Sequence, residues 1–387
     1  MVNKRIPLSV PYIAGNEWRY VNNCLSTSWV STAGKYVDLF ENKVAEFTQS
    51  KYAVSCINGT SALHTCLLLS GVRDGDEVIM PTISFIAPAN AISYCGAKPI
   101  FMDADDNYCI DIKKTIEFIK QNTFFKNKHS FNKKTKKRIS ALIVVHVYGR
   151  SVQLDELITV CKSRNIKIVE DAAESFGNFY LKGKFKKKHT GTVGLFGCLS
   201  FNGNKVITTG GGGMILTNSK RLAQKAKYLT TTAKDDSVQF IHKEVGYNYR
   251  ITNLQAAMGL AQLEKIKLFL KKKEHAYLSY KKYFSKNKNV QFKDLPNNAT
   301  SNYWLNLVEF KNISKKNDLI KIIKNLNKNN IEARPIWYLN HLQNKFKKCQ
   351  KFNIKNATKL VKRTLCLPSS VSITNTEIKK VVSIING

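Results

Sequence analysis

The sequence reads VEDAAESFG over residues 169–177 and LSFNGNKVITTGGGGM over residues 199–214. Asp171 ends an apolar run in the first stretch, and the carboxyl ends of such strands face the ligand crevice in open α/β sheets. Lys205 lies in the second stretch, between uncharged residues and a run of glycines where the backbone must fold tightly. The two stretches predict an α/β sheet that presents a carboxylate and a lysine to a ligand.

Short β-rich runs alternate with helix-like stretches on both sides of these segments, from about Ala53 to Thr217. Several runs are apolar at consecutive positions, which is typical of strands covered on both faces. Strands are predicted at residues 52–57, 77–81, 98–103, 141–149, 167–171, 198–202 and 212–217, and helices at residues 61–70 and 154–165. This alternation predicts an α/β fold with a mainly parallel or mixed sheet.

The pattern after Thr217 becomes more helical, and a long amphipathic run covers residues 252–284. It is followed by WLNLVEF, a helical pattern over residues 318–329, IEARPIW and a final helix from Thr376. At 387 residues the chain exceeds a single compact core. We expect a large domain over residues 1–265 and a smaller C-terminal α/β lobe over residues 266–387, with an N-terminal segment able to pack on the small lobe.

The net charge is high, because 62 lysines and arginines stand against 27 aspartates and glutamates, a formal charge of +35. Such an excess is compatible with nucleic acid, a membrane surface or an anionic substrate as partner. The lysines are spread through segments rich in Asn and Ile, which favours compositional drift as the cause. The basic stretch Lys126–Arg138 is expected to be a solvated, mobile loop.

Other features of the composition exclude further classes of protein. The sequence has no apolar run of the about 18 residues that a membrane span needs, and its N-terminus lacks the apolar core of a secretory signal. The nine cysteines form no CxxC pair and no zinc-like cluster with histidine. Neither a disulfide framework nor a metal site is expected, and the chain is predicted to be cytoplasmic, without membrane insertion.

Asp171 and Lys205 are the residue types that pyridoxal-phosphate chemistry requires. A lysine amine attacks a carbonyl carbon when a pocket lowers its pKa and orients it. A carboxylate beside the pyridine nitrogen keeps that nitrogen protonated, so that the ring withdraws electrons from the reacting carbon. Lys205 is therefore the candidate Schiff-base lysine and Asp171 the candidate partner of the ring nitrogen, against the plainer expectation that a lysine is a solvated surface side chain.

Further motifs extend over nearly the whole chain: PLSVPYIAGNEWRYV, TSWVSTAGKYVDLFE, INGTSALHTCLLL, DEVIMPTISFIAPANAI, EDAAESFG, SFNGNKVITTGGGGM, GYNYRITNLQAAMGLAQL and ARPIW. Each motif alone would be weak, but together they resemble the DegT/DnrJ/EryC1/StrS family of sugar aminotransferases. The resemblance implies a fold-type-I pyridoxal-phosphate enzyme, with a large domain built on a mainly parallel mixed sheet between helices. The motif set is most similar to the LegC-like branch of that family.

The resemblance implies roles for residues at matching positions. Lys205 would be the Schiff-base lysine and Asp171 the partner of the pyridine nitrogen. Further cofactor contacts are implied at Gly59, Thr60, Ser61, Phe85, Glu174, Ser200 and Asn202. A glycine turn at a helix N-terminus favours a phosphate, and Phe85 would stack on the ring. Thr60 and Ser61 could equally be ordinary N-cap residues, and Phe85 and Ser200 core residues.

The GYNYR segment matches one that reaches into the neighbouring subunit's active site in the family. The match implies a homodimer with shared sites, in which Asn248 contacts the cofactor phosphate and Tyr247 the substrate. Without the family, the same residues would form a loop before a helix capped by Thr252. Arg334, Trp337 and His189 are further candidate substrate contacts, although a surface arginine and a solvated loop histidine are the plainer expectations.

The resemblance implies transfer of an amino group from L-glutamate to the C4 keto group of a UDP-4-keto-6-deoxy-N-acetylhexosamine by a ping-pong mechanism. The product would serve bacterial surface polysaccharide, lipopolysaccharide or legionaminic-acid-type biosynthesis. The alternatives are a GDP-linked 4-keto-6-deoxyhexose of perosamine type and a C3-keto sugar. A related dehydratase would carry histidine in place of Lys205. A basic nucleic-acid-binding protein or a non-catalytic regulator are more distant alternatives.

Overall fold

A mixed β-sheet forms the centre of the structure, a computed structural model that describes residues 5–236, 238–313 and 316–386. The main path of the sheet has the order β1-β9-β8-β7-β6-β2-β3-β13. Neighbours from β8 to β13 are parallel, whereas β9 is antiparallel to β8 and β1. The strands are β1 (Tyr52–Cys56), β2 (Glu77–Pro81), β3 (Lys98–Met102), β6 (Arg138–Val145), β7 (Lys167–Asp171), β8 (Phe196–Ser200), β9 (Gly213–Thr217) and β13 (Lys351–Phe352).

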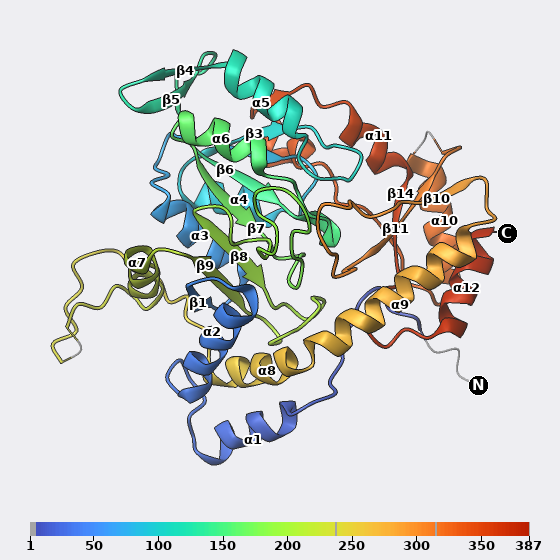
Figure 1. Ribbon diagram of the computed structural model, residues 1–387, viewed down its shortest axis with the longest axis horizontal. Helices are drawn as coiled ribbons and strands as arrows, with labels where there is room; N and C mark the ends of the chain where they lie inside the picture. Colours follow the sequence, from blue (N-terminus) through green and yellow to red (C-terminus); the bar gives the residue numbers. More distant parts are fainter. Residues whose placement is uncertain (1–4, 237, 314–315, 387) are drawn as a thin grey trace.

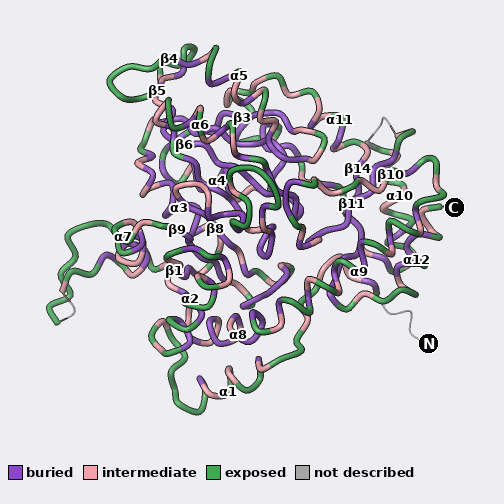
Figure 2. The backbone as a smooth tube through the Cα atoms, in the orientation of Figure 1, coloured by how far each residue is buried: buried purple, intermediate pink, exposed green. Residues whose placement is uncertain are grey.

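Helices surround this sheet (Figure 1). α3 packs against α4 and α7, α5 against α6, and α8 against α1 and α2. The central strands are buried while the outer loops are exposed (Figure 2). The helices are α1 (Glu17–Ser26), α2 (Lys35–Thr48), α3 (Gly59–Leu69), α4 (Ala87–Tyr94), α5 (Ile112–Gln121), α6 (Asp155–Ser163), α7 (Lys220–Thr230) and α8 (Asn253–Glu264), with the 3₁₀-helix η1 (Val147–Gly149) after β6.

The predicted strands of the large sheet are confirmed to within a few residues. In β6 every residue from Ile139 to Val145 is buried, and all of β2 is buried as well. Consecutive apolar residues in these strands meet helices on both faces, which explains why the sequence shows no alternation there. The α/β fold with a mainly parallel, mixed sheet is therefore as predicted.

A second, antiparallel sheet follows in the chain, in the order β10-β11-β14-β12. It has its own hydrophobic core, to which Tyr280, Phe284, Val308 and Ile378 contribute. Its strands are β10 (Val290–Phe292), β11 (Asn306–Phe310), β12 (Arg334–Pro335) and β14 (Thr364–Leu367). The helices of this region are α9 (Ile266–Phe284), α10 (Lys316–Lys328), α11 (Asn356–Arg363) and α12 (Asn375–Asn386), with the 3₁₀-helices η2 (Asn340–Leu342) and η3 (Asn344–Phe346).

Within the described residues, the chain passes between the two sheets more than once. The amphipathic run over residues 252–284 forms two helices, α8 and α9, which are interrupted at Lys265. At the N-terminus, Ile6 forms a β-bridge with Ile331 and packs in the core of the second sheet. After the second sheet has begun, the chain returns to the first one, where β13 pairs with β3. We propose the interruption at Lys265 as the boundary between the two lobes.

The basic stretch Lys126–Arg138 differs from its prediction as a loop. It contributes to a hairpin of β4 (Thr123–Lys126) and β5 (His129–Asn132), and β5 also pairs with β6. Phe124 and Phe131 stack across the hairpin with ring centroids 5.5 Å apart. Cross-strand aromatic pairs stabilise such hairpins, and the surrounding lysines hide this pattern in the sequence.

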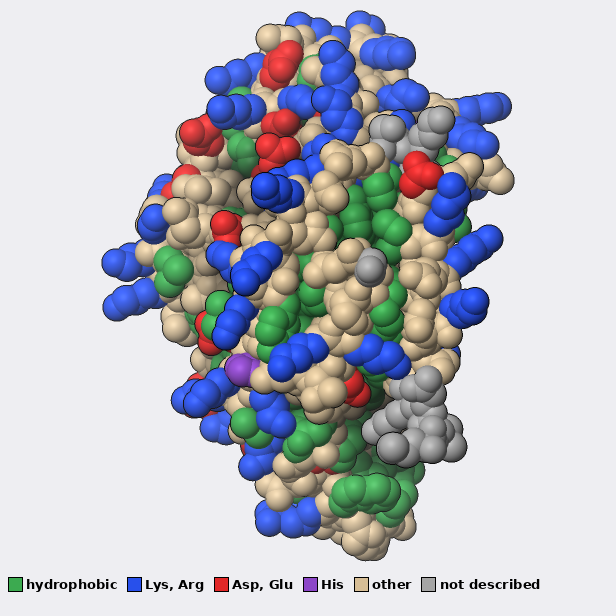
Figure 3. Space-filling view, turned by 90° about the vertical axis from the view of Figure 1, so that its right-hand side faces the viewer, with side chains coloured by type: hydrophobic (Ala, Val, Ile, Leu, Met, Phe, Trp, Pro, Cys, Tyr) green, Lys and Arg blue, Asp and Glu red, His purple; other side chains and the backbone are tan. Residues whose placement is uncertain are grey.

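The charged side chains do not gather in one patch on the face shown in Figure 3, where lysines and arginines are scattered among uncharged surface. This face therefore shows no continuous basic stripe of the kind that binds nucleic acid. Among the helices of the described residues, none is both long and apolar enough to cross a bilayer.

Candidate active site

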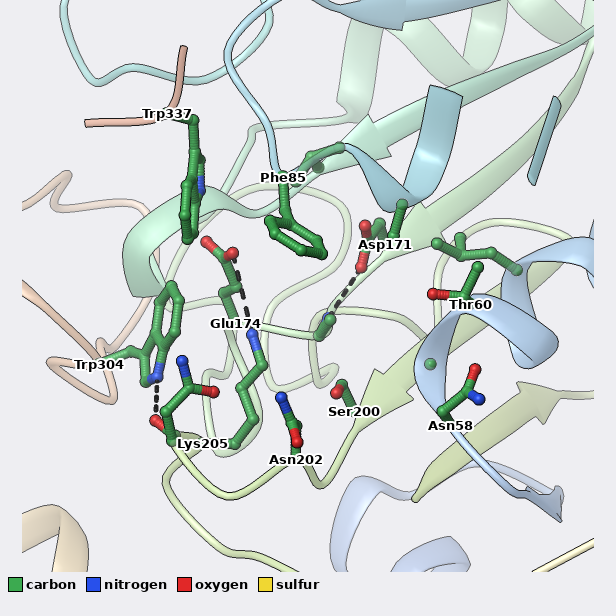
Figure 4. Close-up of a pocket in the computed structure, with 16 residues that line it drawn as sticks. Asn58, Thr60, Phe85, Asp171, Glu174, Ser200, Asn202, Lys205, Trp304 and Trp337 are labelled. Atoms are coloured by element: carbon green, nitrogen blue, oxygen red, sulfur yellow. Dashed lines mark hydrogen bonds and ion pairs between the residues drawn. The ribbon is translucent and has the colours of Figure 1, made fainter. Parts of the chain in front are cut away.

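A cavity of about 260 Å³ opens where β6, β7 and β8 end, beside the N-terminus of α3. Figure 4 shows Lys205 and Glu174 at one end of this cavity and Thr60 at the other, with Asp171 and Phe85 between them. The lining residues are Asn58, Gly59, Thr60, Leu63, Phe85, Ala87, Val145, Asp171, Ala173, Glu174, Ser200, Asn202, Asn204, Lys205, Trp304 and Trp337. Parallel strands bring these groups together, because their carboxyl ends meet at one edge of the sheet.

The end of the cavity at α3 is suited to an anion. Asn58 caps the helix, since its side-chain oxygen accepts the Ser61 N–H at 2.8 Å. The first N–H groups of a helix have no partner within the helix, and they attract negative charge. A Cβ at Gly59 would lie 3.0 Å from the Ser200 Cβ, and one at Gly213 would lie 2.4 Å from the Asn58 carbonyl oxygen. Glycine at both positions therefore allows the close approach that forms this cradle.

Asp171 lies at the end of β7 and is buried. Its carboxylate accepts the Ala173 N–H at 3.1 Å, which fixes the side chain toward the cavity. Burial raises the pKa of Asp171, and the positive charge of Lys205 acts in the opposite direction. A cation placed beside this carboxylate would favour its charged form.

Lys205 follows β8, and its side chain is 13% exposed. Its amine lies 3.8 Å from Glu174 Oε1 and 4.0 Å from the centroid of the Trp304 ring. Burial lowers the pKa of Lys205, while the charges of Glu174 and Asp171 oppose this effect. A larger neutral fraction makes the amine a better nucleophile toward a carbonyl carbon.

Glu174 is a second buried carboxylate in the cavity. Burial raises its pKa to about 7, although the nearby Lys205 charge and the hydrogen bond from the Tyr148 N–H act to lower it. That hydrogen bond measures 2.7 Å, and Tyr148 adopts a left-handed φ of 56°. The Tyr148 hydroxyl in turn accepts the Trp337 N–H at 2.7 Å. Glu174 is thus held in place and can exchange a proton close to neutral pH.

The model of the DegT/DnrJ/EryC1/StrS aminotransferase family matches residues 11–386. The chain belongs to this family. The predicted family, enzyme class and cofactor are therefore confirmed: the protein is a pyridoxal-phosphate-dependent sugar aminotransferase.

Individual relatives of this DegT/DnrJ/EryC1/StrS aminotransferase are named for nucleotide sugars. GDP-perosamine synthase of Escherichia coli O157:H7 is 36% identical over 384 residues, which cover 99% of this chain and 98% of the relative. UDP-4-amino-4,6-dideoxy-N-acetyl-beta-L-altrosamine transaminase of Campylobacter jejuni subsp. jejuni serotype O:23/36 (strain 81-176) is 33% identical over 262 residues, which cover 67% and 64%.

Solved structures with a similar fold were also found. Spr1654 from Streptococcus pneumoniae, in its PLP form, superposes with a TM-score of 0.87 over 99% of this chain and 98% of its own, at 21% identity. At this identity the likeness shows the fold alone.

The cavity of this DegT/DnrJ/EryC1/StrS aminotransferase fits pyridoxal phosphate. The cofactor needs an anion cradle, a carboxylate for its ring nitrogen and an amine for its aldehyde, and the α3 N-terminus, Asp171 and Lys205 supply these three groups on one cavity. Phe85 is 53% exposed and contacts the Trp337 ring edge-to-face, which leaves one aromatic face toward the cavity.

Most of the predicted cofactor contacts lie together in the cavity. They are Gly59, Thr60, Phe85, Asp171, Glu174, Ser200, Asn202 and Lys205, and the predicted substrate contact Trp337 joins them. Ser61 lies in the first turn of α3, where its N–H is used by the Asn58 cap and its side chain is buried.

His189 does not line the cavity, contrary to its prediction as a substrate contact. It is fully buried, its ring packs against Phe176 and Phe179, and its Nε2 accepts the Gly177 N–H at 2.9 Å. Burial lowers the pKa of His189 to about 3. The neighbouring lysines suggested a solvated loop, but the histidine fixes the backbone after Glu174 as a neutral core residue.

Three other predicted residues lie outside the cavity of their own chain. Asn248 is exposed and forms an isolated antiparallel β-bridge with Thr231. Tyr247 stacks on Tyr249 with ring centroids 5.0 Å apart. Arg334 is exposed and pairs with Glu332 at 2.7 Å. Within one chain these residues do not contact the groups around Lys205.

Sequence reasoning missed several residues of the cavity, of which Trp304 and Asn58 matter most. Asn58 could have been found, because it lies three residues before the predicted start of this helix and has a side chain suited to capping. Trp304 carries no such signal, since it comes 100 residues after Asn204, whose carbonyl oxygen accepts its indole N–H. The remaining unpredicted lining residues are Leu63, Ala87, Val145, Ala173 and Asn204.

Proposed function

We propose that the protein transfers the amino group of L-glutamate to the C4 keto carbon of a nucleotide-linked 4-keto-6-deoxy sugar. The observation that supports this most is the single cavity that joins Lys205, Asp171 and the anion cradle of α3. The family supplies the reaction type, and the named relatives supply the class of substrate.

The bound cofactor supplies an electron sink for the carbon that loses its proton. Lys205 would move that proton: burial lowers the pKa of its amine, which could accept a proton from one carbon and return it to another. Asp171 would hold the ring nitrogen and keep it protonated. The Glu174 carboxyl lies 3.8 Å from the amine and exchanges protons with it as the charge on Lys205 changes. Gly59, Thr60, Ser200 and Asn202 would hold the phosphate end, and Ser61 would contribute through the first turn of α3.

The nucleotide is the point on which the named relatives differ. A GDP-linked 4-keto-6-deoxyhexose is the first candidate, because the E. coli relative named for GDP-perosamine matches 99% of the chain. A UDP-linked 4-keto-6-deoxy-N-acetylhexosamine, expected from the LegC-like motifs, is the second, and the C. jejuni relative named for a UDP sugar matches 67%. In either case the product would serve a bacterial surface polysaccharide made from sugars activated in the cytoplasm.

A second copy of the chain completes the site in this proposal. The described residues between α7 and α8 extend away from the body (Figure 1). This arm exposes large apolar side chains, with Val238 84% and Val245 80% exposed, and it leads to Tyr247 and Asn248. Exposed apolar residues on an extended arm favour burial against another chain. In a homodimer the arm would carry Asn248 to the partner's cofactor phosphate.

The test combines product analysis with mapping of the modified lysine. The protein is incubated with pyridoxal phosphate, glutamate and GDP- or UDP-linked 4-keto and 3-keto sugars, and the products are identified by mass spectrometry and by NMR of the aminated carbon. Borohydride reduction of the loaded protein and peptide mapping should place the cofactor on Lys205. Trapping on another lysine, or no aminated sugar in any arm, would overturn the proposal.

A further inference from the structure

Trp304 precedes β11 of the second sheet, yet it lines the cavity of the first. Its ring centroid lies 4.0 Å from the Lys205 amine, and its indole N–H donates to the Asn204 carbonyl at 2.7 Å. One side chain therefore contacts both the reactive amine and the backbone directly before it. The ring also keeps water from one side of the amine.

Asn302 makes matching contacts to the other catalytic loop. Its side-chain amide nitrogen donates to the carbonyls of Glu174 at 3.0 Å and Phe176 at 3.1 Å. Its side-chain oxygen accepts the backbone N–H of Trp304 at 3.0 Å. Gly149 packs so closely that a Cβ there would lie 2.2 Å from the same oxygen. Residues 302–304 thus join the loop that follows β7 to the loop that follows β8.

Lys273 of α9 supports this segment from the other side. Its amine donates to the carbonyls of Trp304 at 3.1 Å and Ser369 at 2.6 Å, and the residue is 2% exposed. Within the described residues, no carboxylate pairs with it. A buried lysine held only by carbonyl oxygens is unfavourable for folding unless it remains neutral, and burial indeed lowers its pKa to about 7. The cavity does not include Lys273, so its contacts act through Trp304.

We propose that residues 302–304, supported by Lys273, form a clamp that sets the position of the Lys205 amine relative to Glu174. Trp304 and Lys273 are then positioning residues for amino transfer. The effect on turnover rests on the proposed function, whereas the placement of Lys205 can be measured without any sugar.

The first test follows Lys205 in the full-length protein freed of cofactor. Competitive acetylation over a pH series, with peptide mapping, gives the pH midpoint at which each lysine reacts. The wild-type midpoint for Lys205 should lie below that of Lys271, which is exposed on α9, the helix that also carries Lys273. Trp304→Phe removes the indole N–H and Lys273→Met removes the amine. Each should raise the Lys205 midpoint by about half to one pH unit, because a looser loop admits water.

The second test separates positioning from binding in the loaded enzyme. Both variants should lower kcat about tenfold while KM for the keto sugar stays within about twofold, since displacement of a catalytic group slows chemistry without removing a substrate contact. The kcat of the double variant should be no lower than that of the more impaired single variant, because both changes act on one segment. Lys271→Met and Trp18→Phe, an exposed lysine and an exposed tryptophan, are the matched controls and should match wild type.

The outcomes are distinguishable. If Trp304→Phe and Lys273→Met both keep the wild-type midpoint of Lys205, the clamp is wrong. Fully additive losses of kcat would overturn it as well. If Lys273→Met does not fold, Trp304→Phe decides alone, because it retains an aromatic ring. If the wild type aminates no sugar, the proposed function fails, and the acetylation midpoints still test the clamp.

Discussion

Lys205 and Lys273 are both largely buried, and burial lowers the pKa of each, but their surroundings differ. Lys205 opens onto a cavity and has Glu174 3.8 Å from its amine. Lys273 is enclosed, and its amine donates hydrogen bonds to two backbone carbonyls. We infer from this comparison that a lowered pKa alone does not make a lysine reactive. Space for a carbonyl compound and a carboxylate that exchanges protons are also needed, and only Lys205 has both.

The largest effect should come from removing the amine of Lys205. Lys205→Ala should reduce turnover by about 10³-fold or more, because proton transfer by a positioned group contributes about 10² to 10⁴. It should also abolish the visible absorbance of cofactor joined to lysine, which Lys273→Met should keep. Titration with pyridoxal phosphate and initial rates measure the two effects. A Lys205→Ala protein within tenfold of wild type would remove the distinction between the two lysines.

The next effect should come from Asp171, the second carboxylate in the cavity onto which Lys205 opens. Asp171→Asn preserves the size of the side chain and a hydrogen bond to the Ala173 N–H, but removes the negative charge. Turnover should fall about 10²-fold, as in the loss of one electrostatic group from a site. Asp38→Asn on the surface of α2 is the matched control. Equal rates for the two variants, compared by steady-state kinetics, would argue against a charge at Asp171.

A smaller effect concerns the pH dependence of stability. Burial raises the pKa of Glu174 from 4.5 to about 7, so its stabilising contribution is complete below 4.5 and is lost as pH rises through about 7. Glu174→Gln lacks this dependence. The Tm of the variant minus the Tm of wild type should therefore increase by about 2 °C between about pH 5 and pH 8. Scanning fluorimetry of cofactor-free protein measures it, and a constant difference would contradict the assignment.

An effect of similar size on Tm should have the opposite sign. The pKa of Lys273 is lowered from 10.5 to about 7, so its contribution is present above 10.5 and is lost as pH falls toward 7. Lys273→Met should therefore compare better with wild type at about pH 7 than at about pH 9.5, by about 2 °C in Tm. The unpaired carbonyls that it leaves destabilise the variant at every pH. A pH-independent difference would mean that Lys273 is charged in the native protein.

The sequence predicted the large sheet and the groups at its edge well, because local patterns determine them. Asp171 ends an apolar strand and Gly59 opens a helix, and each is recognisable from its immediate neighbours. Lys205 needed the family motif, since its uncharged surroundings alone would have left it as one lysine among many.

Contacts between distant parts of the chain could not be predicted in this way. Trp304 reaches Lys205 only because the second lobe folds back on the first, and no local pattern before β11 indicates that. His189 is buried next to a lysine-rich stretch, so the composition of its neighbours suggested solvent. The β4–β5 hairpin was hidden by lysines in the same way, while its two stacked phenylalanines determine the structure.

The return of the chain to the first sheet has a practical consequence for dissecting the protein. β13 covers one edge of β3, and the Phe101 N–H donates to the Gln350 carbonyl at 2.9 Å. A fragment cut at Lys265 would leave β3 as an open edge strand with unpaired backbone groups, which invites association with other chains. The first lobe expressed alone should form aggregates, and the two lobes are best studied within one polypeptide.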